Sequence, residues 1–419
     1  MTSELSLATM APTQAPALVR DGAADAAEID AEIDYVARAR ALQPLIAEAA
    51  PRTEAGRQLA DEVVAALHDE GLFRLMMPDW LGGGEAAPSV FVAMVETVAR
   101  ADASTAWCLC QQNVCSIASV YLAPAIARQI FGERGAALAW GSTPDAKAVK
   151  VAGGYRVSGH WEFGSGCHHA SWLGGHCPVV AQDGTPLLGD DGQPCERTVL
   201  FPKSAARIAD EWHVLGLRGT GSDMYTLDDL FVPEELTILT LQRWPGAAQR
   251  QGATPYRFGA SSLYAAGFAA VALGNARGML DAFIELARRK VARWERDPLA
   301  ASALVQAAAA ENDTELEGAR VYLIETLRRV EREALCDGGL TLDDRMKIRA
   351  AGTAAIRRAT AVVNQLYEMA GTTAIFEGNP FERRFRDAHT VSQHLQGRVS
   401  HFETVGKHLF GMAADTRFV

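Results

Sequence analysis

The spacing of apolar residues changes twice along the chain, and this change constrains the fold more than any other feature of the sequence. From about residue 29 to residue 139 and again from about residue 256, apolar residues recur every three or four positions, which is the period of a helix. Between about residues 141 and 240 the pattern becomes one of short β-prone runs separated by glycine pairs and Asp-Gly turns. The sequence therefore predicts a mainly α protein with a small central β domain.

This pattern divides the chain into four segments. We expect a mobile tail at residues 1–28, an N-terminal helical domain at 29–139, a small β domain at 140–240 and a C-terminal helical bundle at 241–419. The tail is rich in Ala, Pro and Thr and lacks a basic region followed by an apolar stretch, so it does not resemble a secretory signal. The sequence shows no internal repeat of fixed period.

The C-terminal bundle contains the clearest helical pattern. One predicted helix carries a stripe of five apolar residues at steps of four and three: Leu280, Ile284, Ala287, Val291 and Trp294. Such a stripe packs against a neighbouring helix or against another subunit. Because this stripe and the Ala- and Gly-rich run before it offer more apolar surface than one bundle easily hides, we predict a homotetramer. A further helix is predicted from about Asp343 to Ala370, ending at Gly371.

Charge and cysteine content narrow the class of protein. The chain has 40 Lys and Arg against 51 Asp and Glu, a net charge of −11, which disfavours a nucleic-acid partner. Its seven cysteines lack the paired spacing of a metal site, so we predict no metal and a reducing, cytoplasmic location. Two uncharged stretches, Thr105–Ala127 and Phe258–Ala276, are too polar or too weakly apolar for membrane spans. We expect both to be buried helices and expect no membrane partner.

Four motifs resemble those of the acyl-CoA dehydrogenase fold. They lie along nearly the whole chain, at Pro78–Gly84, Phe231–Pro233, Ala272–Gly278 and Arg383–Asp387. The resemblance implies an N-terminal helical domain, a β-barrel-like domain and a C-terminal four-helix bundle, in that order.

Two chemistries occur within this superfamily, and the sequence favours the second. Acyl-CoA dehydrogenases use a glutamate base, but residues 388–397 after Asp387 contain no glutamate, and the other candidate position falls near Ser261 and Ser262. By contrast, Gly154–Gly166, Gly216–Asp223 and Arg386-Asp387 followed by His394 resemble the oxygenase components of two-component flavin monooxygenases, the group D aromatic hydroxylases. An acyl-CoA dehydrogenase-type enzyme acting on a thioester, and a catalytically silent scaffold, remain the alternatives.

The resemblance implies a cofactor, a partner and a reaction. Reduced FMN or FAD would come from a separate flavin reductase. One alternative is that the flavin reaches this protein by diffusion alone, without contact between the two proteins. The enzyme would use it with O2, through a C4a-hydroperoxyflavin, to oxygenate an aromatic or heteroaromatic small molecule. Ser165 would lie beside flavin N5 and His394 beside C4a, where hydrogen bonds protect the oxygenated flavin. Otherwise Ser165 is a turn serine and His394 a surface histidine, and His389 is the competing histidine.

Further residues are assigned to the flavin site by position or by the same resemblance. Trp161 and Phe163 alternate along one predicted strand and share a face, either as a wall against the flavin ring or as β-domain core. Ser142 and Thr143 are possible hydrogen-bond donors to the pyrimidine edge. Arg293, in a basic run beside the predicted stripe, and the loop Gly371-Thr372-Thr373 are candidates for the flavin phosphate, although a solvated helix face also explains the basic run.

The predicted substrate side is a helix that carries Trp107, Gln112 and Asn113. Several phenol hydroxylases of this group have a histidine on the corresponding helix, thought to activate the substrate hydroxyl, and this chain has none there. An amide side chain orients a ligand but is not a base. His168 and His169 are the alternative source of an imidazole. The substrate class is therefore open to heteroaromatic, sulfur or nitrogen oxidation as well as to phenols.

Overall fold

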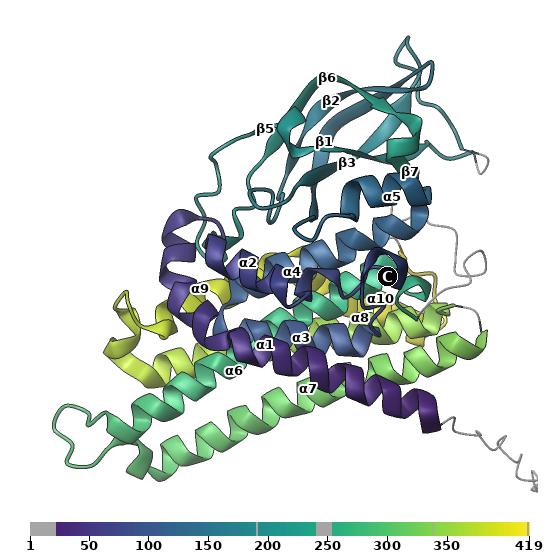
Figure 1. The fold of residues 1–419 in the computed structure, drawn as a ribbon. Helices are drawn as coiled ribbons and strands as arrows, with labels where there is room; N and C mark the ends of the chain where they lie inside the picture. Colours follow the sequence, from purple (N-terminus) through teal and green to yellow (C-terminus); the bar gives the residue numbers. More distant parts are fainter. Residues whose placement is uncertain (1–21, 190–191, 240–253, 338, 417–418) are drawn as a thin grey trace, which may run out of the picture.

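The computed structural model describes residues 22–189, 192–239, 254–337, 339–416 and 419. Within these ranges a mixed β-sheet lies along one side of a larger helical body, as Figure 1 shows. The predicted tail lies mostly outside the described residues, and the first helix begins at Gly22. None of the helices in the described ranges combines the length and apolar character that crossing a bilayer requires.

Five helices precede the sheet. They are α1 (Gly22–Gly56), α2 (Asp61–Asp69), α3 (Pro88–Ala101), α4 (Ala103–Ser116) and α5 (Pro124–Phe131). Helix α4 begins sharply because the Asp102 carboxylate accepts hydrogen bonds from the Thr105 backbone N–H at 2.7 Å and from its hydroxyl at 2.8 Å. Nearly every residue of α4 is buried, so the expectation of a buried helix here is confirmed.

The sheet has seven strands. They are β1 (Leu138–Val151), β2 (Gly154–Glu162), β3 (Trp172–Val180), β4 (Glu196–Pro202), β5 (Arg207–Ile208), β6 (Tyr225–Pro233) and β7 (Thr237–Leu239), in the order β5-β6-β2-β1-β3-β4-β7. Only β1 and β3 pair in parallel among these strands. The register of β1 against β2 shifts between Ser142 and Asp145, which marks a bulge.

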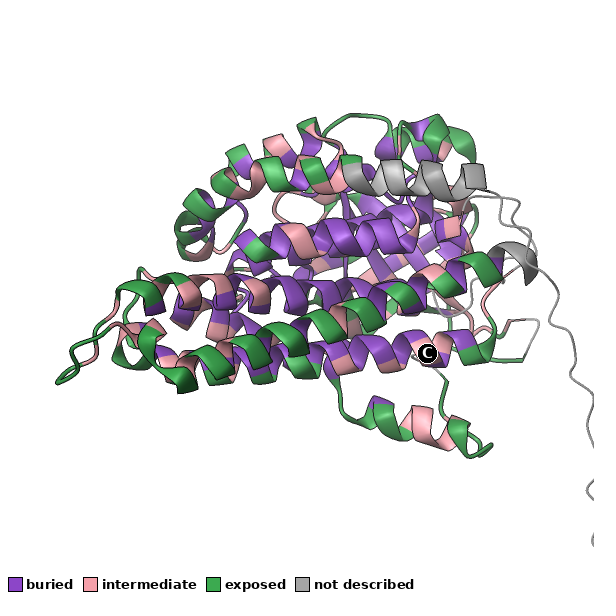
Figure 2. Ribbon diagram, turned by 90° about the horizontal axis from the view of Figure 1, so that it is seen from below, coloured by how far each residue is buried: buried purple, intermediate pink, exposed green. Residues whose placement is uncertain are grey.

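The C-terminal region is helical. Its helices are α6 (Ala260–Arg289), α7 (Ala303–Asp337), α8 (Leu342–Ala370), α9 (Pro380–Gln393) and α10 (Ser400–Leu409). Figure 2 shows the long helices buried on the faces that meet and exposed on their outer faces. Helix α8 has a capping box at Thr341 and Asp344 and ends before Gly371, as predicted.

The predicted apolar stripe does not extend through one helix. Helix α6 stops at Arg289, so Val291 and Trp294 lie in the following loop, where they are 49% and 89% exposed. Trp294 adopts a left-handed φ of 74°, which no helix continues through. Only the first part of the stripe packs in the core, because Leu280 and Ala287 are buried while Ile284 is partly buried.

Candidate active site

Three segments far apart in sequence meet at one cluster. Trp107 lies on α4, Ser165 on the loop after β2, and His394 immediately after α9. The Trp107 indole Nε1–H donates a hydrogen bond to Ser165 Oγ at 3.0 Å. The His394 ring stands edge-on to Trp107, with 5.0 Å between ring centroids. The structure thus brings the predicted catalytic pair Ser165 and His394 to the same indole.

A tight loop positions Ser165. Strand β2 ends at Glu162, and Phe163 adopts a left-handed φ of 60°. Gly166 has a left-handed φ of 78°, and its backbone N–H donates to Thr220 O at 3.0 Å. A Cβ atom at this position would lie 2.7 Å from Gln112 Nε2. This position therefore requires glycine, and the bend aims the Ser165 side chain at α4.

Hydroxyl groups surround Ser165. Ser222 Oγ lies 2.7 Å from Ser165 Oγ, and Thr220 Oγ1 lies 2.6 Å from Ser222 Oγ. The Thr220 hydroxyl donates to the backbone carbonyl of Leu217 at 2.8 Å. All three hydroxyl residues are at most 5% exposed. They form a continuous buried chain from the Ser165 side chain to a main-chain carbonyl.

His394 is a neutral imidazole in an aromatic setting. Its ring lies 4.7 Å from that of Phe268, which stacks on Trp107 at 3.9 Å. Burial, reinforced by the cations Arg349 and Arg398, lowers its pKa to about 4. The backbone N–H of Gln396 donates to Nδ1 at 3.4 Å, which assigns the proton to Nε2. At neutral pH His394 is thus a hydrogen-bond donor through Nε2.

The competing histidine points elsewhere. His389 Nε2 lies 2.8 Å from Asn364 Oδ1 on α8, and its ring packs against Phe385. These contacts give His389 a role in packing α8 against α9. In the part of the chain that the structure describes, neither Ser165 nor His394 contacts a carboxylate. The base of an acyl-CoA dehydrogenase therefore has no counterpart at this cluster.

Trp161 and Phe163 do not share a face, contrary to the sequence prediction. Trp161 is fully buried in the β-domain core, where it stacks on Tyr225 and donates to His176 O at 3.2 Å. Phe163 lies beyond the end of β2 and is 58% exposed. Its left-handed backbone interrupts the two-residue alternation on which the prediction depended. Of the two residues, only Phe163 offers a ring surface to a ligand.

Gln112 and Asn113 have structural partners rather than a free ligand-facing group. Asn113 donates to Leu72 O at 2.8 Å and to Leu109 O at 2.9 Å, and it is fully buried. Gln112 donates to Gly166 O at 3.3 Å and contacts His169 Nε2 at 3.0 Å. Both amides therefore hold α4 to its neighbours, and their role in binding substrate stays a prediction. Burial lowers the pKa of His169 to about 3.

The residues predicted at the two ends of the flavin lie apart on this chain. Ser142 is exposed at the β1 bulge opposite Glu162, and the Thr143 hydroxyl accepts from the Asp145 N–H at 2.8 Å. Lys290 follows α6. Its ammonium group donates to the carbonyl of Ala370, the last residue of α8, at 2.6 Å, and to Thr373 Oγ1, just after α8, at 2.8 Å. The basic run and the Gly371–Thr373 loop thus meet at one end of the bundle, at the left of Figure 1.

Within that end of the bundle, Arg293 is exposed. Its guanidinium carbon lies 5.1 Å from the centroid of the Trp294 ring. Thr372 is exposed as well, whereas Gly371 closes α8 with a φ of 60°. These groups are open to a ligand or to another copy of the chain.

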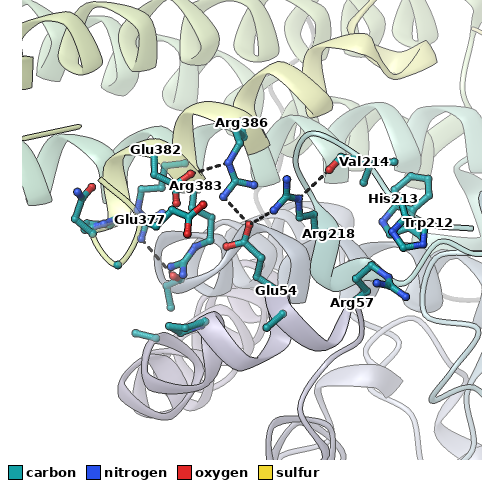
Figure 3. Close-up of a pocket in the computed structure, with 18 residues that line it drawn as sticks. Glu54, Arg57, Trp212, His213, Val214, Arg218, Glu377, Glu382, Arg383 and Arg386 are labelled. Carbon is teal, nitrogen blue, oxygen red and sulfur yellow. Dashed lines mark hydrogen bonds and ion pairs between the residues drawn. The ribbon is translucent and has the colours of Figure 1, made fainter. Parts of the chain in front are cut away.

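A groove of about 850 Å³ lies between α1, α9 and residues 212–218. Figure 3 shows its charged lining. Arg386 pairs with Glu54 and Glu382, and Arg218 also pairs with Glu54, so these two arginines are matched by carboxylates within the groove. Neither Ser165 nor His394 lines it. We take the cluster of Trp107, Ser165 and His394 as the candidate active site, because Ser165 and His394, two residues that carry the family resemblance, converge there.

Residues that the sequence prediction missed link the two regions. Trp212 lines the groove and meets the Phe163 ring edge-on at 6.1 Å. Asp223 positions Trp212 by accepting from its backbone N–H at 2.7 Å. The roles of Thr220 and Ser222 were also missed, although both lie in the segment Gly216–Asp223 that carries the family resemblance. Phe268 was hidden in an Ala- and Gly-rich run that gave no sign of a ring contact.

Known proteins match this arrangement. Residues 28–123 match the model of the acyl-CoA dehydrogenase N-terminal domain, and residues 266–398 match that of the acyl-CoA dehydrogenase C-terminal domain. The flavin-dependent monooxygenase oxygenase subunit HsaA of Rhodococcus jostii (strain RHA1) is 30% identical over 377 residues, covering 85% of this chain and 93% of the relative. The crystal structure of the 3-HSA hydroxylase from Rhodococcus sp. RHA1 has a TM-score of 0.82 at 27% identity, covering 92% and 99% of the two chains.

Two further relatives are similar over most of their length. Indole-3-acetate monooxygenase of Pseudomonas putida is 28% identical, covering 85% of this chain and 88% of the relative. The oxygenase component of the FADH2-dependent resorcinol hydroxylase of Rhizobium sp. (strain MTP-10005) is 28% identical, covering 88% and 92%. The chain belongs to the oxygenase components of flavin-dependent monooxygenases with the acyl-CoA dehydrogenase fold. The predictions of family, fold and reduced flavin as cofactor are confirmed at this level.

Proposed function

We infer that this protein uses reduced flavin and O2 to oxygenate an aromatic or heteroaromatic small molecule. The observation that carries this proposal is the convergence of Trp107, Ser165 and His394, which come from three separate segments. The reaction needs hydrogen-bonding groups placed around the flavin in a site closed to water. The cluster offers a hydroxyl and a neutral imidazole among buried aromatic rings.

The residues present fit a flavin ring. Phe163 has a 58% exposed ring one residue from the Gly164-Ser165 bend, and Trp212 borders it. A planar ring that stacks on Phe163 would have Ser165 at its edge. Reduced flavin supplies the electrons that activate O2. Ser165 would bind the N5 position, and His394 would donate from Nε2 toward the C4a side, while Trp107 and Phe268 exclude water.

The relatives and the cluster together support an aromatic substrate. Indole-3-acetate and resorcinol appear in the names of two relatives, so both heteroaromatic and phenolic substrates occur among them. The helix α4 of this chain faces the cluster with Trp107 rather than with a base. We therefore propose a substrate that does not require deprotonation of a phenol, with an indole-like heteroaromatic compound as the first candidate.

The proposed assembly is a homotetramer served by a separate flavin reductase. The candidates for the flavin phosphate, Arg293 and Gly371–Thr373, lie just after the C-terminal ends of α6 and α8. We propose that they complete the flavin site of another subunit. Exposed apolar side chains support further subunit contacts, and the most exposed in the described part of the chain are Trp294, Leu304, Leu409 and Phe410. Cytoplasmic location and the choice between FMN and FAD stay predictions.

The test mixes anaerobically reduced FMN or FAD with the protein, then adds labelled O2 and a panel of indoles, phenols and thioethers. We expect one labelled oxygen atom in a product. We also expect fewer moles of hydrogen peroxide to form than moles of flavin are oxidised. Stoichiometric peroxide with every member of the panel, together with failure to bind reduced flavin, would contradict it. Light scattering of the same sample tests the tetramer, for which about four times the 44.9 kDa chain mass is expected.

A further inference from the structure

The hydroxyl chain behind Ser165 has a fixed direction. A hydroxyl has one proton to donate and can accept two hydrogen bonds. Thr220 gives its proton to the Leu217 carbonyl, which can only accept, so at 2.6 Å Ser222 must be the donor to Thr220. The proton of Ser222 is then committed, and at 2.7 Å Ser165 must donate to Ser222.

The direction leaves Ser165 as an acceptor. Its own proton points to Ser222, and one of its lone pairs receives the Trp107 indole N–H at 3.0 Å. One lone pair remains for a ligand. Because these residues are at most 6% exposed, water does not readily compete for the hydroxyls.

We propose that Thr220 and Ser222 are positioning residues that set the site's preference for reduced over oxidised flavin by holding Ser165 as a hydrogen-bond acceptor. This proposal rests on the proposed function, which places Ser165 at flavin N5. Reduced flavin carries a proton on N5 and donates it to an acceptor. Oxidised flavin has only a lone pair at N5 and needs a donor, which Ser165 cannot be while Ser222 takes its proton.

The experiment measures the dissociation constants of oxidised and of dithionite-reduced FMN under anaerobic conditions, and then repeats both with FAD. In Ser222→Ala the Ser165 hydroxyl is free to turn and donate to oxidised N5. We expect the ratio of the oxidised to the reduced dissociation constant to fall by about threefold to tenfold, the worth of one neutral hydrogen bond. Thr220→Val should change the ratio in the same direction, and Thr220→Ser should restore it.

A double variant separates the relay from a packing defect. If Ser222 acts through Ser165, then adding Ser222→Ala to Ser165→Ala should change the ratio no further. Ser116→Ala is the matched control, because Ser116 is also a buried serine. It lies on α4, and its hydroxyl donates to Asn113 O at 2.7 Å, apart from the row of hydroxyls behind Ser165. It should leave the ratio as in the wild type.

The outcomes separate this proposal from the function beneath it. A ratio that changes in Ser165→Ala but not in Ser222→Ala or Thr220→Val overturns the relay and leaves the flavin placement intact. A ratio unchanged even in Ser165→Ala overturns the placement of Ser165 at N5, and the relay with it. An equal loss of affinity for both flavin forms in Ser222→Ala also overturns the proposal, because it indicates packing rather than hydrogen-bond direction.

Discussion

The molecule has two polar regions of opposite character, the Ser165–His394 cluster and the charged groove of Figure 3. The groove has a volume of about 850 Å³, and two of its arginines, Arg218 and Arg386, pair with Glu54 and Glu382. The cluster contains only neutral groups, because burial keeps the His394 imidazole uncharged. By volume and charge the groove is the more conspicuous candidate for a binding site. The hydrogen-bonding capacity left for a ligand favours the Ser165–His394 cluster.

This difference indicates separate roles. The ion pairs of Arg386 with Glu54 and Glu382 link α9 to α1, and removing one partner of such a pair destabilises the fold. Neutral donors in a closed site are worth most when charge develops beside them. We therefore expect changes at the cluster to alter chemistry and changes in the groove to alter stability.

The largest effect is expected from His394→Ala. Losing one positioned donor in a closed site costs roughly 2.7–4 kcal/mol, so oxidised flavin and hydrogen peroxide should appear about 100-fold faster after O2 is added. The affinity for reduced flavin should change little. His389→Ala is the matched control, since it removes a histidine on α9 that contacts Asn364 instead. Equal peroxide formation in both variants and the wild type would remove His394 from the site.

Arg386→Ala should produce the next largest effect, on stability. It leaves Glu54 and Glu382, which are 20% and 17% exposed, without their shared cation. The free energy of unfolding should fall by about 2 kcal/mol. Arg383→Ala, the control, changes a neighbour in the groove for which no ion pair is found in the described part of the chain. If urea denaturation instead shows equal stability and peroxide formation rises, the division of roles is wrong.

The pH dependence of stability should follow the buried histidines. Burial lowers the pKa of His169 to about 3 and those of His176 and His394 to about 4, against 6.5 in the unfolded chain. The unfolded state thus binds more protons, and the free energy of unfolding should decrease as pH falls from about 6.5 to about 4. Asp387 opposes this trend, since burial raises its pKa to about 7 and its protonation favours the folded state.

His176→Asn tests whether the buried histidines cause this pH dependence. It should make the free energy of unfolding depend less steeply on pH. An asparagine can keep the contact with Thr198 Oγ1, now 2.7 Å from His176 Nδ1, while it removes the titrating group. The exposed His213 provides the control substitution, His213→Asn. A slope that is the same in both variants would locate the pH dependence in other groups.

The smallest effect is expected from acyl-CoA thioesters. Proton abstraction beside a thioester requires a positioned base, and the described contacts of the cluster include no carboxylate. Anaerobic titration of flavin-loaded protein with thioesters of varied chain length should leave the absorbance of oxidised flavin unchanged. Rapid bleaching would favour the dehydrogenase alternative over the oxygenase chemistry.

Sequence patterns predicted long-range order better than local geometry. The helical and β periods are set by burial over many residues, so the order of helices, sheet and helices followed from them. The stripe was predicted too long, because α6 ends where Lys290 turns to Ala370 and Thr373, a tertiary contact that no local pattern contains.

The candidate site shows the same limit. The resemblance selected Ser165 and His394, and the structure places both beside Trp107. The internal partners of Gln112 and Asn113 could not be predicted, because the sequence does not show that backbone carbonyls accept hydrogen bonds from these amides. Trp161 and Phe163 were misjudged because one left-handed residue reverses a side chain without changing the composition of the strand.

That left-handed residue also bears on how the enzyme can be improved. A bulky aromatic residue at a φ of 60° is conformationally costly, by roughly 1–3 kcal/mol, whereas glycine adopts the same backbone freely. Selection for heat resistance alone would therefore favour Phe163→Gly and discard the ring proposed to support the flavin. A thermostability library for this protein should hold position 163 fixed and seek its gains elsewhere.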